Sequence, residues 1–409
     1  MTERRTLVKR SANSILGMVA VLAIAIICQS SGAESPALAA ISAEWPDVPM
    51  TTITMITTIP VLMMIPSSLF FSFFRNKIRI RPTACVFMLI TIVGGVLPAW
   101  ADSIGQILIG RAIFGLGMGI MWPMAQALVI ELYEGNKQDK MLGYNNLVVA
   151  VGGVIWANVG GVLATYSWRY SFFAYFIPIA VMIFIMLFLP EPPKPKERVA
   201  DEPAKEGKKN TIGGLAILLV VYFLFNFGNM VYYTNLAMKV IGEGLGNEAN
   251  SGFAQSINLV GAIVIGLIFG YLMKNKTLKQ ISLGIGWLFV ALGFIIVGFA
   301  GSFAMVVFGS FFCGWGTGWF MPTILGMFCR LGGNNAAVFI GISACVLGFS
   351  QFVGPLIINA ITGPMGDAGI GRIPLLMAGG LHLVCGAVAL IVCIILKNKK
   401  TPNIINTIE

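Results

Sequence analysis

The chain has 409 residues, of which 57% are apolar and only 11% are charged. A soluble protein of this composition would be covered in hydrocarbon side chains, so the solvent around most of the chain must be lipid. The formal net charge of +10 does not indicate nucleic-acid binding, because that function needs a basic face on a soluble domain.

Twelve apolar segments, each at least as long as the about 20 residues that cross a bilayer, are predicted to be membrane-spanning helices. Their apolar runs are continuous and do not alternate, which favours helices over the strands of a barrel. The sequence therefore predicts an all-α membrane protein. The predicted spans are residues 14–43, 50–73, 79–101, 104–131, 141–165, 169–190, 213–236, 251–273, 278–300, 302–329, 336–362 and 373–396.

Lysine and arginine lie mostly on one side of these spans. Twenty-three of the 27 fall in the N-terminal arm and in every second gap after it, and only Arg111, Arg169, Lys239 and Arg372 fall on the other side. Because cytoplasmic loops retain Lys and Arg, this distribution predicts an inner-membrane protein with both termini in the cytoplasm.

The N-terminal arm also resembles a cleaved twin-arginine signal, with Arg4-Arg5, an apolar run and Ala37-Leu-Ala39. Loss of the first span would invert every later loop against its charge. The basic arm is therefore interpreted as a cytoplasmic anchor.

One hydrophilic stretch divides the chain into two halves. Residues 190–212 are rich in proline and charge, which predicts a cytoplasmic linker between six spans at 1–189 and six at 213–409. The halves also repeat. Gly115-Leu-Gly117-Met-Gly119-Ile-Met-Trp-Pro123 in the fourth span has a counterpart 199 positions later, Gly314-Trp-Gly316-Thr-Gly318-Trp-Phe-Met-Pro322, in the tenth.

With Arg111 four residues before Gly115, and with Trp168-Arg169-Tyr-Ser-Phe before the sixth span, the chain resembles the major facilitator superfamily over essentially its whole length. The resemblance implies two six-helix bundles that rock about a site near the membrane midplane. Glycine spacing predicts close helix packing on both faces of these helices, and the prolines mark possible hinges. The expected packing and gating residues are Gly115, Gly117, Gly119, Pro123, Gly314, Gly316, Gly318, Pro322, Gly354 and Pro355.

Three segments depart from the family pattern. Ser72 and Lys274 stand where the second-to-third and eighth-to-ninth segments usually carry an acid that helps to latch the bundles. The latch is therefore either made otherwise or weak. In the fifth span, Trp156-Ala157 replaces the Gly-Pro pair of the antiporter signature, which weakens the case for a drug/proton antiporter.

Three ionisable residues lie inside apolar spans, Glu34, Arg111 and His382. A charge at membrane depth costs roughly 2.5–3.5 kcal/mol, so it normally faces a partner or a wet cavity. Glu34 and Arg111 both fall in outer halves of their spans, where an ion pair can form. The Glu34 carboxyl group could bind and release a proton as access alternates. Alternatively, the ion pair could serve only to hold the N-terminal bundle together. For His382 a helix-packing hydrogen bond is expected.

Polar side chains give the seventh span a face that could contact a solute. Asn226, Asn229 and Tyr233 recur at three- and four-residue spacing. Each amide could instead join neighbouring helices. Together with Glu34 and Arg111, the candidate substrate and coupling residues are Gln29, Asn158, Asn226, Asn229, Tyr233, Gln255, Asn258, Gln351 and Asn359.

The function predicted from these features is secondary transport. Without a phosphate-binding Gly-x-x-x-x-Gly-Lys-Ser/Thr loop to bind ATP, the energy must come from a gradient. Proton-linked uptake of a small organic solute and efflux of a drug or metabolite by antiport remain open, with a channel or lipid flippase as a further alternative. The chain has one histidine, and its seven cysteines lack C-x-x-C spacing. We therefore expect no enzyme activity, no metal site and no cofactor. The chain is expected to act as a monomer in the bilayer.

Overall fold

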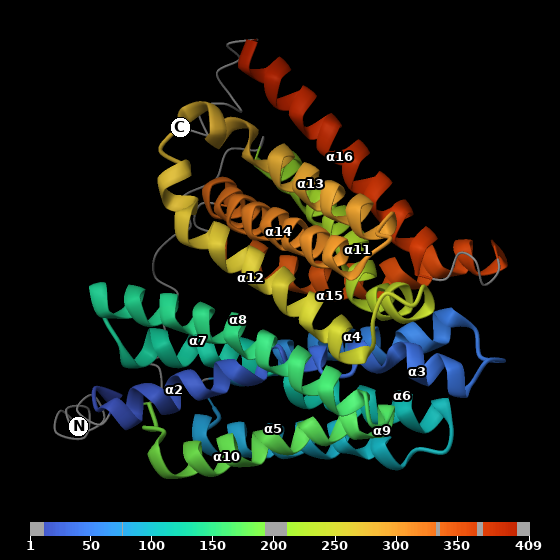
Figure 1. Cartoon of the computed structure of the whole chain (residues 1–409). Helices are drawn as coiled ribbons and strands as arrows, with labels where there is room; N and C mark the ends of the chain where they lie inside the picture. Colours follow the sequence, from blue (N-terminus) through green and yellow to red (C-terminus); the bar gives the residue numbers. More distant parts are fainter. Residues whose placement is uncertain (1–11, 76, 193–210, 333–335, 366–370, 399–409) are drawn as a thin grey trace. The chain divides into compact units, whose positions relative to one another are not determined.

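The computed structural model describes residues 12–75, 77–192, 211–332, 336–365 and 371–398, and in these residues the secondary structure is helical (Figure 1). Twelve helical segments of the described chain are long and apolar enough to cross a membrane. They coincide with the twelve predicted spans, with ends that differ by a few residues. The all-α membrane fold is thereby confirmed.

The first six spans are built from short and long helices in chain order. Short 3-10 turns interrupt several of them, at Ser30–Gly32, Ser35–Ala37, Leu97–Trp100 and Phe172–Phe176. The helices are α2 (Ile15–Ile27), α3 (Leu38–Glu44), α4 (Met50–Phe74), α5 (Ile80–Val96), α6 (Ile104–Met118), α7 (Met121–Leu132), α8 (Asn136–Ala164), α9 (Trp168–Ser171) and α10 (Ile177–Phe188).

The last six spans are long single helices. They are α11 (Thr211–Gly242), α12 (Glu248–Leu272), α13 (Lys276–Gly298), α14 (Phe303–Gly332), α15 (Ala336–Thr362) and α16 (Arg372–Asn398). A buried aromatic and aliphatic cluster from α11, α13 and α14 forms their core, with Phe225 and Phe320 stacked face to face at 3.6 Å between ring centroids.

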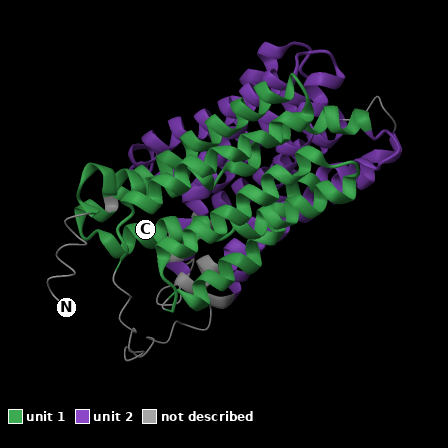
Figure 2. Cartoon of the chain, turned by 90° about the horizontal axis from the view of Figure 1, so that it is seen from below, with its two compact units in different colours: residues 1–44, 55–200 green, residues 45–54, 201–409 purple. Residues whose placement is uncertain are grey.

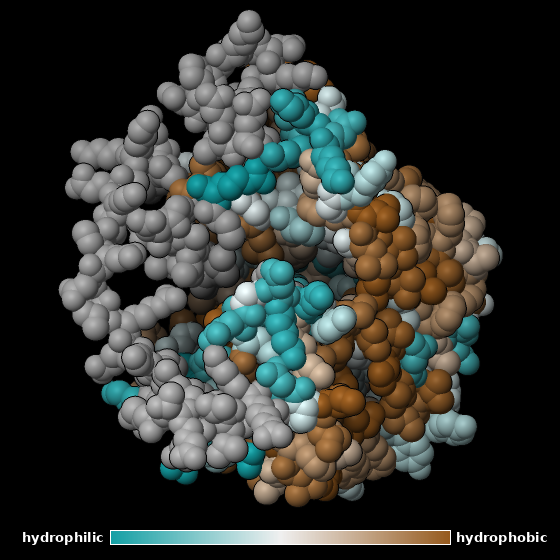
Figure 3. All heavy atoms as spheres, turned by 90° about the vertical axis from the view of Figure 1, so that its left-hand side faces the viewer, coloured by the Kyte–Doolittle hydropathy of each residue, from teal (hydrophilic) through white to brown (hydrophobic). Residues whose placement is uncertain are grey.

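The chain divides into two compact units, residues 1–44 with 55–200, and residues 45–54 with 201–409 (Figure 2). The expected linker at 190–212 lies largely outside the described residues. Figure 3 shows hydrophobic and hydrophilic residues gathered in separate areas of the surface that it draws. Large apolar side chains such as Leu267, Phe73 and Leu187 are exposed in both units, as expected where lipid is the solvent.

The repeated glycines let helices touch backbone to backbone. A Cβ at Gly115 or Gly119 would lie under 3 Å from the backbone of α4, and one at Gly117 would meet the backbone of α5. The second half repeats this arrangement, with Gly314 and Gly318 against α12 and Gly316 against α13. The predicted close packing on both helix faces is confirmed, and the sequence repeat corresponds to a structural one.

The prolines behave differently in the two halves. Pro123 follows a break between α6 and α7, whereas Pro322 and Pro355 lie inside the continuous helices α14 and α15. Proline cannot donate to the carbonyl four residues earlier. For Pro123 that carbonyl belongs to Gly119, and the Ser68 hydroxyl donates to it at 2.7 Å. The Gly119 carbonyl therefore has a hydrogen-bond donor although the helix is broken at this point.

Two expected spans differ from the structure. The first span is broken between α2 and α3 and is not one helix. The helix of the seventh span continues to Gly242, six residues past its predicted end, and therefore includes Lys239. Lys239 is 1% exposed and pairs with Glu243 one turn later. This i,i+4 pairing neutralises the buried lysine at the end of the helix.

Replacement of Gly115 or Gly119 by Leu should destabilise the protein by about 1–3 kcal/mol and sharply reduce transport, because a branched side chain must enter the backbone of α4. Gly143→Leu is the matched control, since a Cβ at Gly143 meets nothing within 4 Å. The measurement is the melting temperature in detergent together with initial transport rate. Unimpaired stability and transport in both α6 variants would contradict the packing interpretation.

Candidate functional site

The candidate site lies where the first span is broken. α2 ends at Ile27, and two 3-10 turns, Ser30–Gly32 and Ser35–Ala37, lead to α3. Glu34 precedes the second turn, which carries Pro36 at its start. Because Gly32 and Pro36 both disfavour a continuous helix, the chain leaves helical geometry here and places a carboxylate in the interior of the span.

Glu34, Arg111 and Tyr175 form a buried network inside the first unit, and all three are 0% exposed. The Arg111 guanidinium forms an ion pair with one Glu34 oxygen and, at 3.0 Å, donates to the Tyr175 hydroxyl. The Tyr175 hydroxyl donates to the other Glu34 oxygen. The ion pair expected from the sequence is present.

Backbone carbonyls complete this network. Arg111 Nε donates to the carbonyl of Ile56 at 2.9 Å. This carbonyl is the one that Pro60, four residues later in α4, cannot bond, so the arginine satisfies a group that proline leaves open. The Ser30 carbonyl lies 3.0 Å from the Tyr175 hydroxyl and offers it a second acceptor.

Aromatic rings enclose the charged groups. The Arg111 guanidinium carbon lies 4.3 Å from the Phe114 ring centroid, within the range of a cation–π contact. Trp156 stacks on Tyr175 with 5.8 Å between centroids, and its indole nitrogen donates to the Ile26 carbonyl at 2.8 Å. The residue that replaces glycine in the fifth-span signature thus fixes both the tyrosine and the end of α2.

The arrangement offers hydrogen-bond partners to both protonation states of Glu34, and protonation of Glu34 removes the counter-ion of Arg111. Ionised Glu34 accepts from Arg111 and Tyr175. If Glu34 is protonated, the tyrosine can donate to Ser30 and the arginine keeps its bond to Ile56. A site with alternative acceptors can tolerate both protonation states better than a bare ion pair, because unmade bonds in a buried site are costly.

The polar face of the seventh span contacts helices of its own unit. The Tyr233 hydroxyl donates to Asn258 on α12 at 2.9 Å, and Thr317 on α14 donates to Asn229 at 3.4 Å. Asn226 donates to its own helix at Tyr222 and lies fully buried. The amides of α11 and α12 therefore join helices, and their contact with solute stays a prediction.

The other predicted lining residues differ in burial. Gln255 and Asn359 are buried, Gln29, Asn158 and Gln351 are half-buried, and Asn158 donates to its own helix at Val154. Both amide atoms of Asn359 and the Oδ1 atom of Asn226 have no hydrogen-bond partner in the described part of the chain.

His382 is packed among aromatic rings of the second unit. One ring nitrogen lies 2.8 Å from the Ala378 carbonyl of its own helix, and the ring stacks on Phe294 with 5.3 Å between centroids. A Cβ at Gly228 would lie under 3 Å from this ring. His382 thus bonds to its own helix and makes ring contacts with Phe225 and Trp287 on neighbouring helices. The expected hydrogen bond to a neighbouring helix stays a prediction.

The second-to-third segment carries an ion pair in place of the missing acid. Arg75 binds both carboxylate oxygens of Glu131 at the end of α7, while Ser72 donates to Ser68 in its own helix. At the opposite end of the unit, Arg169 donates to the Ala101 carbonyl at 2.7 Å. The Trp-Arg signature thus ties α9 to the end of the third span.

Sequence reasoning missed three parts of the network: Tyr175, the Ser30 carbonyl and the Ile56 carbonyl. Two signals were present in the chain. Pro60 implies that the carbonyl of Ile56 lacks its helical donor. Ser30-Ser-Gly32 and Ser35-Pro36 imply a break inside the first span. No pattern in the sequence points to Tyr175, since one hydroxyl in an apolar span is common.

Removal of Arg111 should cost about 3–5 kcal/mol, because it leaves a buried carboxylate without its cation. We expect Arg111→Met to lower the melting temperature more than Glu34→Gln does, and the double variant to melt above Arg111→Met alone. A double-mutant cycle measured by thermal unfolding in detergent tests this coupling. Additive losses would show that the two side chains do not stabilise each other.

Comparisons with known proteins agree with this architecture. The model of the Major Facilitator Superfamily matches twice, over residues 13–217 and 218–408. The quinolone resistance protein NorA of Staphylococcus aureus (strain Mu50 / ATCC 700699) is 23% identical over 326 residues, 77% of this chain and 81% of that protein. The probable 4-methylmuconolactone transporter of Cupriavidus pinatubonensis is 31% identical over 96 residues, 22% of each chain.

Solved structures share the fold at low identity. A bacterial homolog of the human lysosomal transporter Spinster, inward-facing and unoccupied, superposes with a TM-score of 0.77 at 14% identity, covering 95% of this chain and all of that one. The nucleoside transporter NupG gives a TM-score of 0.76 at 11% identity, covering 92% and 99%. With the twice-matched family model and twelve spans, the chain belongs to the Major Facilitator Superfamily of membrane transporters.

Proposed function

We propose that the protein is a proton-coupled secondary transporter that moves a small organic solute by alternating access. Glu34 is the proton carrier, and Arg111 and Tyr175 are its partners. The observation that carries the proposal is the burial of this carboxylate, inside a broken span, with one cation and one hydroxyl. Ionisable groups held at membrane depth mark ion pathways and proton relays.

The position of Glu34 supports this role. It lies in the interior of the span Ile15–Glu44, whereas Glu44 and Glu131 lie at the ends of theirs. Carboxylates at span ends can reach water and need no coupling role. A purely structural ion pair would need only Arg111. The neighbouring Ser30 carbonyl gives Tyr175 a second acceptor, which stays available when Glu34 is protonated.

The amides of the second unit are the proposed solute contacts. Asn359 carries two buried polar atoms without partners in the described chain, and Asn226 carries one. A buried amide without a partner costs about 1–3 kcal/mol. A bound polar solute would supply the missing bonds. Asn229, Tyr233 and Asn258 would then hold the surrounding helices in place.

Glu34→Gln should abolish accumulation of solute against its gradient while equilibrium exchange continues, because the amide mimics a permanently protonated acid. A thermal-shift screen of metabolites first identifies a solute, and proteoliposomes with an imposed pH gradient then separate the two activities. Glu44→Gln, the same change at the end of the span, is the matched control and should still accumulate solute. Gradient-driven accumulation by the Glu34→Gln variant would assign Glu34 a structural role.

Uptake by symport is the proposed direction, since Trp156-Ala157 replaces the Gly-Pro pair of the antiporter signature. Export by antiport is the second candidate, and it is supported by similarity to a protein named for quinolone resistance. The same vesicles distinguish the two. Solute movement in the direction of proton flow indicates symport, and movement of a quinolone against proton flow indicates antiport.

Both termini and the segment that joins the units are proposed to lie in the cytoplasm, from the asymmetry of Lys and Arg. In a variant without native cysteines, Ala204→Cys should react with a membrane-impermeant maleimide only after cells are opened. Asp102→Cys, between the third and fourth spans, is the control that should react in intact cells. Labelling in the reverse pattern would invert the proposed orientation.

A further inference from the structure

The helix of the fourth span is interrupted where α6 gives way to α7. The Gly119 amide donates to the Gly115 carbonyl at 2.9 Å, and the Met124 amide donates to the Ile120 carbonyl at 3.1 Å, so regular bonding resumes within one turn. Pro123 lies in that turn and has no N–H for the Gly119 carbonyl. A helix bends most readily where proline removes a bond from its ladder. The angle between α6 and α7 can therefore change here at small cost.

Two adjacent serines of α4 bond to the interrupted segment. The Ser67 hydroxyl donates to the Leu116 carbonyl at 2.6 Å, and the Ser68 hydroxyl donates to the Gly119 carbonyl at 2.7 Å. Both distances are typical of well-formed O–H···O bonds. Ser67 is 4% exposed, so water competes little for its bond. The serines thus supply donors to carbonyls at the point where the helix is broken.

The two carbonyls differ in what a straight helix would offer them. In a continuous helix the Ile120 amide would donate to the Leu116 carbonyl, four residues earlier. The Ser67 hydroxyl now occupies that acceptor. The Gly119 carbonyl has no such alternative, because its helical donor would be a proline. Ser68 is therefore needed whether the span is bent or straight, whereas Ser67 is needed only while the span is bent.

Ser67 has another acceptor available when it leaves α6. A serine hydroxyl in a helix can donate to the carbonyl four residues earlier, which for Ser67 belongs to Met63. Ser72 already has this geometry one turn further along α4, where it donates to the Ser68 carbonyl at 2.9 Å. The bent and straight forms can thus satisfy the same groups with different partners, so neither leaves a buried group without a bond.

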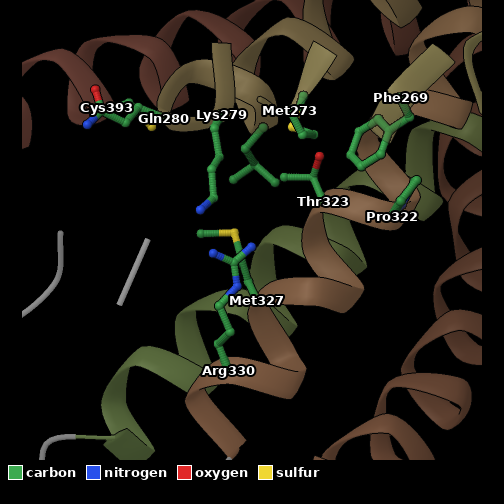
Figure 4. A pocket seen from close by; sticks show the side chains of 10 residues that line it. Phe269, Met273, Lys279, Gln280, Pro322, Thr323, Met327, Arg330 and Cys393 are labelled. Atoms are coloured by element: carbon green, nitrogen blue, oxygen red, sulfur yellow. The ribbon is translucent and has the colours of Figure 1, made fainter. Parts of the chain in front are cut away.

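The second unit has the equivalent proline but not the serines. Gly266 and Leu267 stand 199 positions after Ser67 and Ser68, and neither carries a hydroxyl. α14 continues past Pro322 without interruption, although the proline lines a pocket of about 220 Å³ between α12, α13, α14 and α16 (Figure 4). A proline with open space beside it therefore does not break this helix by itself. The serine pair is a feature of the broken span alone.

Polar contacts of different strength hold the two halves of the fourth span. On α6, Arg111 is enclosed with Glu34, and both side chains are 0% exposed. On α7, Glu131 pairs with Arg75 near the surface, where the two side chains are 17% and 12% exposed. An ion pair that water can reach is broken more easily than an enclosed one. α7 is therefore the half that can move.

We propose that Gly119 and Ile120 form a conformational joint in the fourth span, and that the Ser67 hydroxyl holds this joint bent by occupying the Leu116 carbonyl. When Ser67 turns back to its own helix, the Ile120 amide takes its place and α7 straightens. The enclosed ion pair on α6 stays intact during this movement. The joint depends on neither the transported solute nor the coupling ion, so it can fail or hold independently of the proposed function.

The test measures the position of α7 by pulsed electron paramagnetic resonance on the full chain in proteoliposomes. A variant without native cysteines carries spin labels at Ile130→Cys on α7 and at either Val86→Cys on α5 or Leu147→Cys on α8, which are all exposed positions. α7 has 12 residues, so a change of about 20° at the joint moves its far end by about 6 Å. Two reference helices are used so that movement along either direction is detected.

Ser67→Ala should shift at least one of these distances by up to about 6 Å, because the carbonyl that it occupied becomes free for the Ile120 amide. Pro123→Ala should shift the same distance in the same direction, since it supplies an N–H for the Gly119 carbonyl. The matched control is Ser72→Ala, which removes a hydroxyl from α4 one turn away from the joint. It should leave both distances unchanged.

Unchanged distances in Ser67→Ala would overturn the proposal, even if Pro123→Ala shifts them, because the bend would then not depend on the serine. An equal shift in Ser72→Ala would also overturn it, since it would indicate general loosening of α4.

A second measurement needs no variant and decides the outcome if Ser67→Ala does not fold. In the unmodified chain, hydrogen exchange read by mass spectrometry should be faster in residues 119–122 than in residues 318–321, their counterparts in the continuous helix α14. Equal protection of the two segments would show that the fourth span has no joint.

Discussion

A carboxylate and a guanidinium removed from water must satisfy each other, and much of the first unit is arranged so that Glu34 and Arg111 can do so. The break in the first span brings Glu34 inward, and Pro60 frees the Ile56 carbonyl for Arg111. Gly115, one turn after Arg111, lets α6 lie against α4 at Pro60. The break in the first span, Pro60 and Gly115 thus all help to give the two buried charges their partners.

The two units share a packing plan but differ in chemistry. In both, a glycine-rich helix presses against two neighbours at equivalent positions, Gly115 and Gly119 in one unit and Gly314 and Gly318 in the other. Among the described residues, the first unit alone adds a fully enclosed ion pair deep within a span. The second carries neutral amides and hydroxyls at the corresponding helices, together with an aromatic core around His382. On this division rests the proposal that the first unit holds the proton and the second supplies hydrogen bonds to the solute.

Departures from the family pattern have local structural consequences. Trp156 occupies a position where the antiporter signature has glycine, and its ring fills the space beside Tyr175 while its nitrogen bonds to the end of α2. Ser72 replaces an acid, and Arg75 is held instead by Glu131. Lys274 belongs to a basic segment beside the pocket that contains Lys279. Trp156 and Ser72 thus each change a contact inside the first unit.

The sequence by itself determined the class of the protein, its twelve spans, the repeat of its halves and the glycine contacts, because apolar length and residue spacing act locally along each helix. It also indicated that Glu34 and Arg111 need partners, since their burial cost is a property of the residues. Only the tertiary structure decided what those partners are. Tyr175, the Ser30 carbonyl and the Ile56 carbonyl come from three further segments, and no local pattern encodes their meeting. By contrast, the pair of Lys239 with Glu243 one turn later is a local pattern in the sequence.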